Sequence, residues 1–450
     1  MTLLDGLFGS DALATAFSDH ARVQCMLDFE SALARAEARV GVIPEAAAQA
    51  IAAHCLAENI NFAELAQAAG EAGNLAIPLV KQLTALVKRD SPEAARYIHW
   101  GATSQDAIDT GLMLQAREGL KSIAAGTDQL CELLAELADR HRATPMVART
   151  WMQHAIPTVF GFKVAGWLDA MHRHRRRVQA LTKGGLALQF GGAAGTLAAL
   201  GDRGLAVSKA LAEELQLPLP DLPWHTHRDR VLEIGGTLAM LTGSLGKIAL
   251  DVALHSQTEV GELAEPAKPG RGGSSTMPHK RNPVNASVIL AAAERMPGLV
   301  ATMLGAMPQE QERGLGNWLA EWETLPEIFR LNHGALERTV IVIKGLEVHT
   351  DRMLANLELT RGLVFAEAAA MALAPHVGKG EAHTILEEAS ESAARGQQHL
   401  STVLVADSRV TAHLSAQEIQ RIFDPHACTG EAERFIDRVL ETHRTRSNQQ

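Results

Sequence analysis

The sequence predicts an all-α fold with three helical domains, in which a central bundle of long helices assembles into a multi-subunit core. Ala and Leu dominate and aromatic residues make up only 4% of the 450-residue chain, a composition that favours helices over sheets. Apolar residues recur with helical spacing, and alternating strand patterns bounded by Asn-Gly or Asp-Gly turns are nearly absent. The chain is too long for one core, so we expect two or three domains.

The first block, residues 1–110, has the pattern of short helices. Ser18 or Asp19 can cap one of these helices and Asn61 another, because their side-chain oxygens can accept hydrogen bonds from the free N–H groups of a first turn. The last block, residues 353–450, again has the pattern of shorter helices. We therefore expect a small helical domain at each end of the chain.

The central block, residues 111–352, holds the longest apolar stripes. One stripe predicts a helix over about residues 111–142, and a second predicts a helix between about Arg228 and Leu263. The stripes are Leu130, Leu133, Leu134 and Leu137, and Leu241, Leu245, Ile248 and Val252. A long helix with a single apolar stripe can bury it only against other helices, so we expect a bundle that continues across subunits.

Composition and charge narrow the classes of function. The chain has 42 basic and 52 acidic residues, a net charge of −10, and its basic residues are scattered, which argues against nucleic acid as a partner. We expect neither a zinc site nor a disulfide framework, because the cysteines lie far apart without C-x-x-C spacing. No export signal and no apolar run of 18 residues is evident, so we expect a cytoplasmic protein that does not bind a membrane.

The most informative stretch, residues 272–283, reads G-G-S-S-T-M-P-H-K-R-N-P. Its glycines allow a loop to open for a substrate and to close over it, with backbone N–H groups and the side chains of Ser274, Lys280 and Asn282 pointing inward. Such groups suit a developing oxyanion or enediolate. A plain flexible linker is the alternative, but it does not explain the order of hydroxyls, cation and amide between two prolines.

A second stretch, residues 99–106, reads H-W-G-A-T-S-Q-D and lies just before a predicted long helix. Thr103 or Ser104 can simply cap that helix. A helix N-terminus with two hydroxyls and a histidine, His99, is equally a carboxylate-binding site. The residues alone leave both interpretations open.

Three weaker stretches also carry polar groups in ordered patterns. Residues 149–157 read R-T-W-M-Q-H-A-I-P and offer an arginine, an amide and an imidazole. Residues 190–196 read F-G-G-A-A-G-T, a glycine-rich turn that fits neither a P-loop nor a dinucleotide fingerprint. Arg313 lies in E-R-G-L-G, with Glu321 following; a lone arginine is as often a surface residue as a ligand-binding one.

Taken together, these stretches resemble the motifs of the fumarase/aspartase superfamily, whose members add to, or eliminate across, the double bond of carboxylated substrates. The resemblance runs through most of the chain, with the specific matches between about residues 97 and 325. It implies catalytic roles for Ser274, His99, His154 and Lys280. It implies substrate-binding roles for Thr103, Ser104, Arg149, Trp151, Gln153, Ser275, Met277, His279, Asn282 and Arg313.

Two positions depart from the superfamily pattern together. The second motif usually reads R-T-H-x-Q-x-A-x-P and pairs its histidine with a glutamate seven residues beyond the loop lysine, where this chain has Trp151 and Ser287. A lyase needs two proton-handling groups, one for the leaving group and one for the carbon acid. A substrate carboxylate with a pKa of ~4 is already ionised at neutral pH and can attack without a base. Trp151 can then shape the folded substrate and exclude water.

With this departure the chain resembles most closely the bacterial 3-carboxy-cis,cis-muconate cycloisomerase family. The resemblance implies lactonisation of a tricarboxylate diene in the protocatechuate branch of the β-ketoadipate pathway, without a metal or organic cofactor. It also implies a homotetramer whose active sites combine residues of three subunits. Ser274, His99, His154 and His279 remain alternatives for the proton donor.

Two other functions are compatible with parts of the pattern. An adenylosuccinate lyase, which releases fumarate, nearly shares the first and third motifs but should keep the histidine at position 151 and the glutamate at position 287. A structural protein on the same scaffold would lose its chemical groups at random. In this chain the loop motif is intact and the two departures are coordinated.

Overall fold

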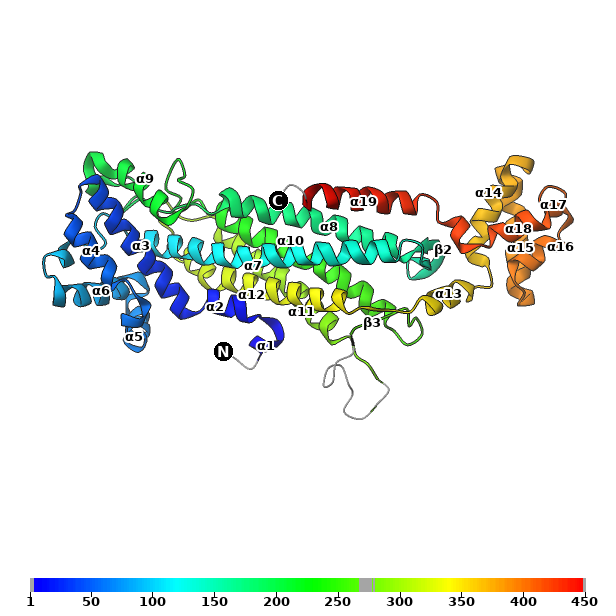
Figure 1. Cartoon of the computed structure of the whole chain (residues 1–450), viewed down its shortest axis with the longest axis horizontal. Helices are drawn as coiled ribbons and strands as arrows, with labels where there is room; N and C mark the ends of the chain where they lie inside the picture. Colours follow the sequence, from blue (N-terminus) through cyan, green and yellow to red (C-terminus); the bar gives the residue numbers. More distant parts are fainter. Residues whose placement is uncertain (1–3, 267–276, 278–279, 448–450) are drawn as a thin grey trace. The chain divides into compact units, whose positions relative to one another are not determined.

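The computed structural model describes residues 4–266, Met277 and 280–447 (Figure 1). This part of the chain is mainly helical, with two short two-stranded sheets, which confirms the all-α prediction. The shorter helices are α1 (Asp5–Phe8), α2 (Asp11–Ala16), α4 (Glu45–His54), α5 (Phe62–Ala72), α6 (Ala76–Asp90), α9 (Gly204–Leu215), α13 (Thr350–Glu358), α14 (Ala366–Val377), α16 (Leu400–Ala406), α17 (Ser408–Thr411) and α18 (Ala416–Ile422). The longer helices are α3 (Asp19–Val40), α7 (Ser104–Arg140), α8 (Phe160–Ala180), α10 (Asp229–His255), α11 (Val284–Ala306), α12 (Asn317–Lys344), α15 (Lys379–Gly396) and α19 (Ala432–Ser447). The strands are β1 (Pro145–Thr150), β2 (Gln153–Val159), β3 (Leu263–Ala264) and β4 (Glu347–Val348).

The chain forms two compact units. Unit 1 comprises Met1–Thr127, His174–Leu245 and Val288–Glu337, and unit 2 comprises Asp128–Arg173, Gly246–Ser287 and Arg338–Gln450. Helices α7, α8, α10, α11 and α12 contribute residues to both units. The three sequence blocks 1–110, 111–352 and 353–450 are a division along the chain and remain a prediction.

The predicted helix starts are largely correct. Ser18 caps α3 by accepting a hydrogen bond from the N–H of Ala21 at 3.1 Å, and Asn61 caps α5 in the same way through Glu64 at 3.2 Å. Helix α7 begins at Ser104, earlier than the predicted residue 111. Apolar periodicity does not mark this start because the first turn of α7 is polar.

In unit 1, glycines allow α7 and α12 to approach closely. A Cβ atom on Gly119 would lie 2.8 Å from the ring of Phe329, and one on Gly126 would lie 2.8 Å from Cδ2 of Leu336. Both distances are shorter than real contacts of that kind. A larger residue at position 119 would therefore displace the ring of Phe329, and one at position 126 would force the side chain of Leu336 to shift.

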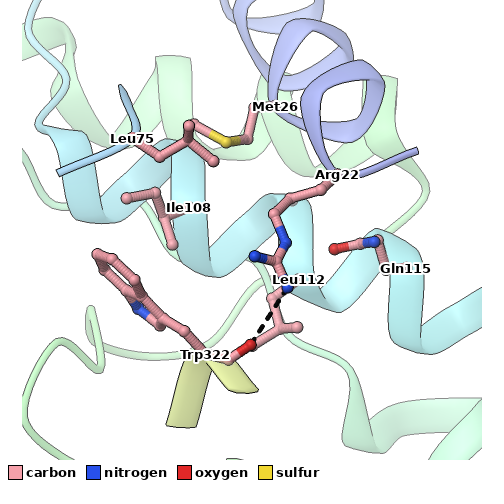
Figure 2. A pocket seen from close by; sticks show the side chains of 8 residues that line it. Arg22, Met26, Leu75, Ile108, Leu112, Gln115 and Trp322 are labelled. Carbon is pink, nitrogen blue, oxygen red and sulfur yellow. Dashed lines mark hydrogen bonds between the residues drawn. The ribbon is translucent and has the colours of Figure 1, made fainter. Parts of the chain in front are cut away.

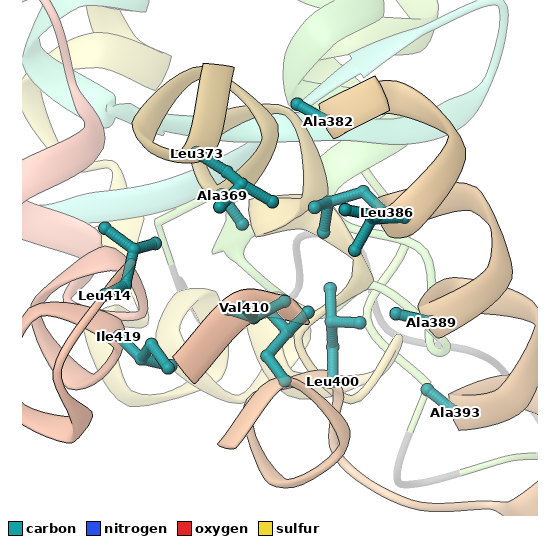
Figure 3. Close-up of a cluster of buried hydrophobic side chains, with 12 residues drawn as sticks. Ala369, Leu373, Ala382, Leu386, Ala389, Ala393, Leu400, Val410, Leu414 and Ile419 are labelled. Atoms are coloured by element: carbon teal, nitrogen blue, oxygen red, sulfur yellow. The ribbon is translucent and has the colours of Figure 1, made fainter. Parts of the chain in front are cut away.

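In unit 2, helices α14 to α18 enclose a small apolar core of their own (Figure 3). Leu373 of α14, Leu386 of α15 and Leu400 of α16 are buried together, and Val410 and Ile419 complete the cluster from α17 and α18. Burying one such side chain stabilises a fold by about 1.5–3 kcal/mol. The predicted short C-terminal helices thus hold one another through shared apolar contacts.

The sequence patterns missed the hairpin formed by β1 and β2. The strands pair antiparallel, with Thr150 opposite Gln153, and Trp151 and Met152 form the turn at φ 51° and 64°. Hairpin turns usually have Asn or Gly at such left-handed positions. Because this turn has a tryptophan and a methionine instead, a search for Asn-Gly or Asp-Gly turns does not find it.

By length and composition, α10 and α11 could each cross a membrane. Core helices of soluble proteins have the same composition. In the most apolar 18-residue stretch of each helix, 56% of the residues are buried in α10 but only 28% in α11. Each window contains at most two charged residues, so the expectation that no apolar stretch of 18 residues exists was too strict. Helix α11 is therefore much less buried than α10 in the single chain.

Candidate active site

The first motif forms a tight turn that leads into α7 in unit 1. His99 has a left-handed backbone with φ 56°, and Gly101 follows at φ 70°. A Cβ atom on Gly101 would lie 2.8 Å from the side chain of Leu200, so only glycine fits there. The turn places His99 and Thr103 close to the free N–H groups at the start of α7.

Asp106 holds this turn against the glycine-rich stretch 190–196. Its carboxylate is fully buried and accepts hydrogen bonds from three separate parts of the chain. The donors are the backbone N–H groups of Thr103 (3.0 Å), Gly191 (3.0 Å) and Gly192 (2.9 Å) and the side chains of Gln189 (3.0 Å) and His225 (2.9 Å). The two predicted stretches are therefore parts of one structure.

Arg313 belongs to the same cluster. Its guanidinium donates to the hydroxyl of Thr103 at 2.7 Å and to the carbonyl oxygens of Ala193 at 2.8 Å and Gly192 at 3.3 Å. Hydroxyl and carbonyl oxygens carry no charge, so these contacts do not neutralise the positive charge of Arg313. Ser104 is half-buried at the first turn of α7. The structure thus brings together His99, Thr103, Ser104 and Arg313.

This arrangement is suited to an anion. The N-terminus of a long helix carries a partial positive charge, and Arg313 adds a full one. Burial works to lower the pKa of His99, but the neighbouring carboxylates Glu30 and Asp106 outweigh it and raise that pKa. A protonated His99 would add a second positive charge beside a bound carboxylate.

A second buried network lies behind this cluster. The guanidinium of Arg228 is 1% exposed, pairs with Asp109 at 2.7 Å and also with Glu321, and lies 4.9 Å from the ring centre of Trp224. Trp318 donates its indole N–H to Asp109 at 3.0 Å. Burial opposes the charge of Arg228, but the two carboxylates raise its pKa further above its ordinary value. These contacts are a structural support for the first turns of α7.

The second motif lies on the β1–β2 hairpin of unit 2. Trp151, at the turn, is 97% exposed, and Gln153 beside it is also exposed. In the single chain these side chains therefore do not enclose a pocket. Their predicted roles in shaping and binding the substrate remain predictions.

Arg149 is held by a carboxylate that the sequence did not predict. Glu262 is fully buried, and its carboxylate accepts hydrogen bonds from both terminal nitrogens of Arg149, at 2.7 Å and 3.0 Å. His255 and Asn356 bond the same carboxylate at 2.6 Å and 2.7 Å. Burial alone would raise the pKa of Glu262, but these partners lower it to about 2. Arg149 has an internal counter-ion, and its role toward a substrate carboxylate stays a prediction.

His154 lies in the same region. Its Nδ1 is buried without a hydrogen-bond partner among the described residues. Burial lowers the pKa of His154, the charge of Arg149 lowers it further, and Glu262 opposes this only in part. The pKa of His154 is thus shifted in the opposite direction to that of His99, and the neutral form of His154 is favoured.

Most of the loop motif lies outside the described residues, including Ser274, Ser275 and His279. Met277 and Lys280 are exposed. Asn282 lines a pocket of about 200 Å³ in unit 2, together with Ser256, Gln257, Glu265, Arg281 and His349.

The chain on either side of the loop motif is firmly fixed. Glu265 accepts from the backbone N–H of Asn285 at 3.1 Å and of Ala286 at 2.7 Å, which caps the start of α11. Arg281 donates to the carbonyl oxygen of Glu265 at 2.8 Å and to both carboxylate oxygens of Glu347.

Another pocket, in unit 1, is too small for a substrate. It is lined by Met26, Leu75 and Leu112 among others, and Arg22 closes one side by donating to the carbonyl oxygen of Trp322 at 3.2 Å (Figure 2). Its volume of about 30 Å³ leaves room for about one water molecule. Within the described ranges, no group of three or more His, Cys, Asp or Glu side chains has the arrangement of a metal site.

Sequence reasoning missed the carboxylates that support the site. Asp106 follows Thr103 by three residues, the spacing of a capping box, and this signal could have identified it. Glu30 and Glu262 have no comparable local signal, because their partners His99 and Arg149 lie 69 and 113 positions away.

Comparisons with known proteins agree with these motifs. Residues 8–298 match the lyase family, and residues 362–439 match the adenylosuccinate lyase C-terminus family. Relatives from Bradyrhizobium diazoefficiens and Pseudomonas aeruginosa, both named 3-carboxy-cis,cis-muconate cycloisomerase, are each 52% identical, over 98% of this chain and 98% and 96% of their own lengths. The crystal structure of 3-carboxy-cis,cis-muconate lactonizing enzyme from Pseudomonas putida matches with a TM-score of 0.94 and 49% identity, over 98% of this chain and 99% of that chain. The chain therefore belongs to the lyase family, as its fumarase/aspartase-type motifs predict.

Proposed function

We propose that this chain catalyses the lactonisation of 3-carboxy-cis,cis-muconate to a carboxymuconolactone, in the protocatechuate branch of the β-ketoadipate pathway. The names of its full-length relatives support this activity. The motifs point the same way, since a tricarboxylate needs several cationic or N–H-rich contacts. Arg313, the start of α7 and Lys280 can provide them.

One observation carries the proposal: the two positions where a superfamily lyase has its histidine–glutamate pair hold residues that handle no proton. Trp151 is an exposed indole at a hairpin turn. Ser287 donates its hydroxyl to the carbonyl oxygen of Val284 at 2.8 Å, a bond within α11. A reaction whose nucleophile is the substrate's own ionised carboxylate does not need that pair.

In the proposed reaction, a carboxylate oxygen of the substrate forms a bond to a carbon of the conjugated diene. The electron pair of the double bond moves toward the neighbouring carboxyl group as an enediolate, and the carbon α to it then takes one proton. Three carboxylates become two carboxylates and a lactone, so each turnover consumes one proton at neutral pH. Lys280, Asn282 and the loop hydroxyls Ser274 and Ser275 hold the enediolate oxygens in this proposal.

The substrate carboxylates bind at two places in this proposal. Thr103, Ser104 and Arg313 form one at the start of α7. Gln153, Met277 and His279 line the other, with Trp151 covering the folded substrate so that water does not compete with the internal carboxylate. The reaction requires no metal or organic cofactor.

Two of the four candidate proton donors can be compared. His99 has a raised pKa and a carboxylate partner, whereas burial and Arg149 lower the pKa of His154. A proton donor must be protonated at the working pH, so these directions favour His99. Ser274 and His279 lie outside the described residues and remain alternatives.

We also propose a cytoplasmic homotetramer with active sites shared between subunits. Helix α11 supports this, because only 28% of its most apolar stretch is buried in the single chain. Trp151 supports it as well, because a fully exposed indole can enclose a substrate only if another subunit covers it. Sedimentation of the purified protein as a monomer would contradict the tetramer.

A direct assay tests the activity. Purified protein, with a chelator present, receives 3-carboxy-cis,cis-muconate, and the ultraviolet absorbance of the diene is followed. We expect the absorbance to fall while one proton is consumed per lactone formed. Stable absorbance with correctly folded protein would contradict the proposal.

The alternative is an adenylosuccinate lyase-type elimination, which the match of residues 362–439 favours. Incubation with adenylosuccinate separates the two functions. Release of AMP and fumarate would support the alternative, and no release together with lactone formation would exclude it.

A further inference from the structure

Glu30 on α3 is a buried carboxylate next to the first motif of the candidate site. Its Oε1 lies 2.6 Å from Nδ1 of His99, and its side chain is 2% exposed, against 17% for His99. Burying a carboxylate is costly unless it is paired and hydrogen-bonded. His99 is the hydrogen-bond partner that the structure gives to Glu30.

This contact decides which nitrogen of His99 can face a ligand. An ionised carboxylate only accepts hydrogen bonds, so Nδ1 carries a proton and donates it to Glu30. In the part of the chain that the structure describes, no group pairs with Nε2. Nε2 is therefore the atom at which His99 can give or take a proton. Its left-handed backbone is strained for a residue other than glycine, and such strain is typical of functional positions.

We propose that Glu30 is a positioning residue for proton transfer, which holds the imidazole of His99 with Nε2 turned to the substrate and stabilises the imidazolium that donates the proton. The inference rests on the proposed function, in which the α-carbon of the substrate gains one proton. Glu30 does not touch the substrate and acts only through His99.

The charged groups around this pair raise the pKa of His99, and the other titratable groups near Glu30 are neutral. Asp106 on α7 adds to the effect of Glu30 in raising the pKa of His99 against burial. Next to Glu30, burial and then the charge of Glu30 itself raise the pKa of Glu37 to about 9, so Glu37 is neutral at neutral pH. Burial, followed by Glu30, also raises the pKa of the Cys55 thiol, which is neutral as well. The negative charge that faces His99 thus belongs to Glu30 and Asp106.

The consequence is a defined pH dependence. An imidazolium donor works only while it is protonated, so activity falls as the pH rises through the pKa of His99. Removing the charge of Glu30 lowers that pKa and moves the fall in activity to lower pH. Opposite charges this close shift a pKa by about 1–3 units, so we expect a displacement of about one pH unit or more.

The experiment compares Glu30→Gln with Glu37→Gln in the full-length protein. Glu30→Gln keeps the size and one acceptor oxygen but removes the charge. Glu37→Gln is the matched control, because it lies two turns further along α3, is 1% exposed and replaces a carboxyl group that is already neutral. The readouts are kcat and KM for lactonisation across pH, and the NMR titration of His99 without substrate, assigned with His99→Asn.

We expect Glu30→Gln to lower kcat at neutral pH, to leave KM nearly unchanged and to move the alkaline fall of kcat to lower pH. Glu37→Gln should match the wild type. An unchanged kcat profile in folded Glu30→Gln would overturn the inference.

The wild-type titration decides the matter if Glu30→Gln does not fold. A pKa of His99 above its ordinary value of 6.5 supports the inference, and a value at or below 6.5 overturns it. Absence of lactonisation by the wild type would instead refute the proposed function, and the titration would still report on the Glu30–His99 pair.

Discussion

Two buried carboxylates, Asp106 in unit 1 and Glu262 in unit 2, organise the two motif regions in different ways. Asp106 accepts mainly from neutral backbone and side-chain donors and so leaves the charge of Arg313 for a ligand. Glu262 instead accepts hydrogen bonds from both terminal nitrogens of the motif arginine, Arg149, and so pairs with its charge. The difference lies in the charge of the motif arginine. Arg149 has a buried counter-ion in Glu262, whereas the contacts of Arg313 within the described residues are to uncharged oxygens.

The largest expected loss of stability is for a substitution of Arg228, which pairs with the buried carboxylates of Asp109 and Glu321. Arg228→Met would leave Asp109 and Glu321 buried without a counter-ion, which should cost about 3–5 kcal/mol of unfolding free energy. Urea unfolding measures this loss. Arg230→Met, on the same helix, is the control: Arg230 has no ion pair within the described ranges, and we expect a loss of about 0.5 kcal/mol or less. Equal losses in the two variants would show that the buried network is not needed.

A smaller loss is expected in unit 2. Arg149→Met leaves Glu262 with its bonds to His255 and Asn356, so we expect a loss of about 1–3 kcal/mol. If the activity survives in the folded variant, Arg149 stabilises the hairpin and does not bind substrate. A loss as large as that of Arg228→Met would contradict the contrast between the two regions.

The third effect is a pH dependence. Glu262 has its pKa lowered from 4.5 to about 2, so its ionised form contributes stability above about pH 4.5, and this contribution is lost as the pH falls toward about 2. The stability difference between the wild type and Glu262→Gln should therefore shrink over that range. Unfolding curves at several acidic pH values test this, and a difference that stays constant with pH would argue against an ionised Glu262.

The smallest effect is expected at Ser287. Its hydroxyl bonds only the carbonyl oxygen of Val284 in its own helix. Ser287→Ala should change the unfolding free energy by about 0.5 kcal/mol or less and leave lactonisation unchanged. A clear loss of kcat without a loss of stability would show that Ser287 handles a proton after all.

The fold could be predicted from the sequence where its signals are local. The stripe through Leu130 and Leu137 identified α7, and Ser18 and Asn61 identified two helix starts. The β1–β2 hairpin could not be found, because Trp151 and Met152 occupy left-handed positions that other residues usually fill.

The site could be predicted only in part, for the same reason. Thr103 and Arg313 belong to recognisable motifs, and the structure brings them within 2.7 Å of each other. Glu30 and Glu262 could not be predicted, because a buried glutamate takes its role from a partner that folding brings to it from a distant part of the sequence. Long-range pairing of this kind leaves no periodic pattern.

The central claim is that a substrate with its own ionised nucleophile makes the histidine–glutamate pair unnecessary. The most direct test is kcat/KM for lactone formation in the double variant Trp151→His/Ser287→Glu. Both positions are exposed, so the variant should fold normally. We predict a loss of about tenfold or more, because a smaller polar side chain would admit water and a new charge would disturb substrate binding. Lactone formation at the wild-type rate would contradict the account.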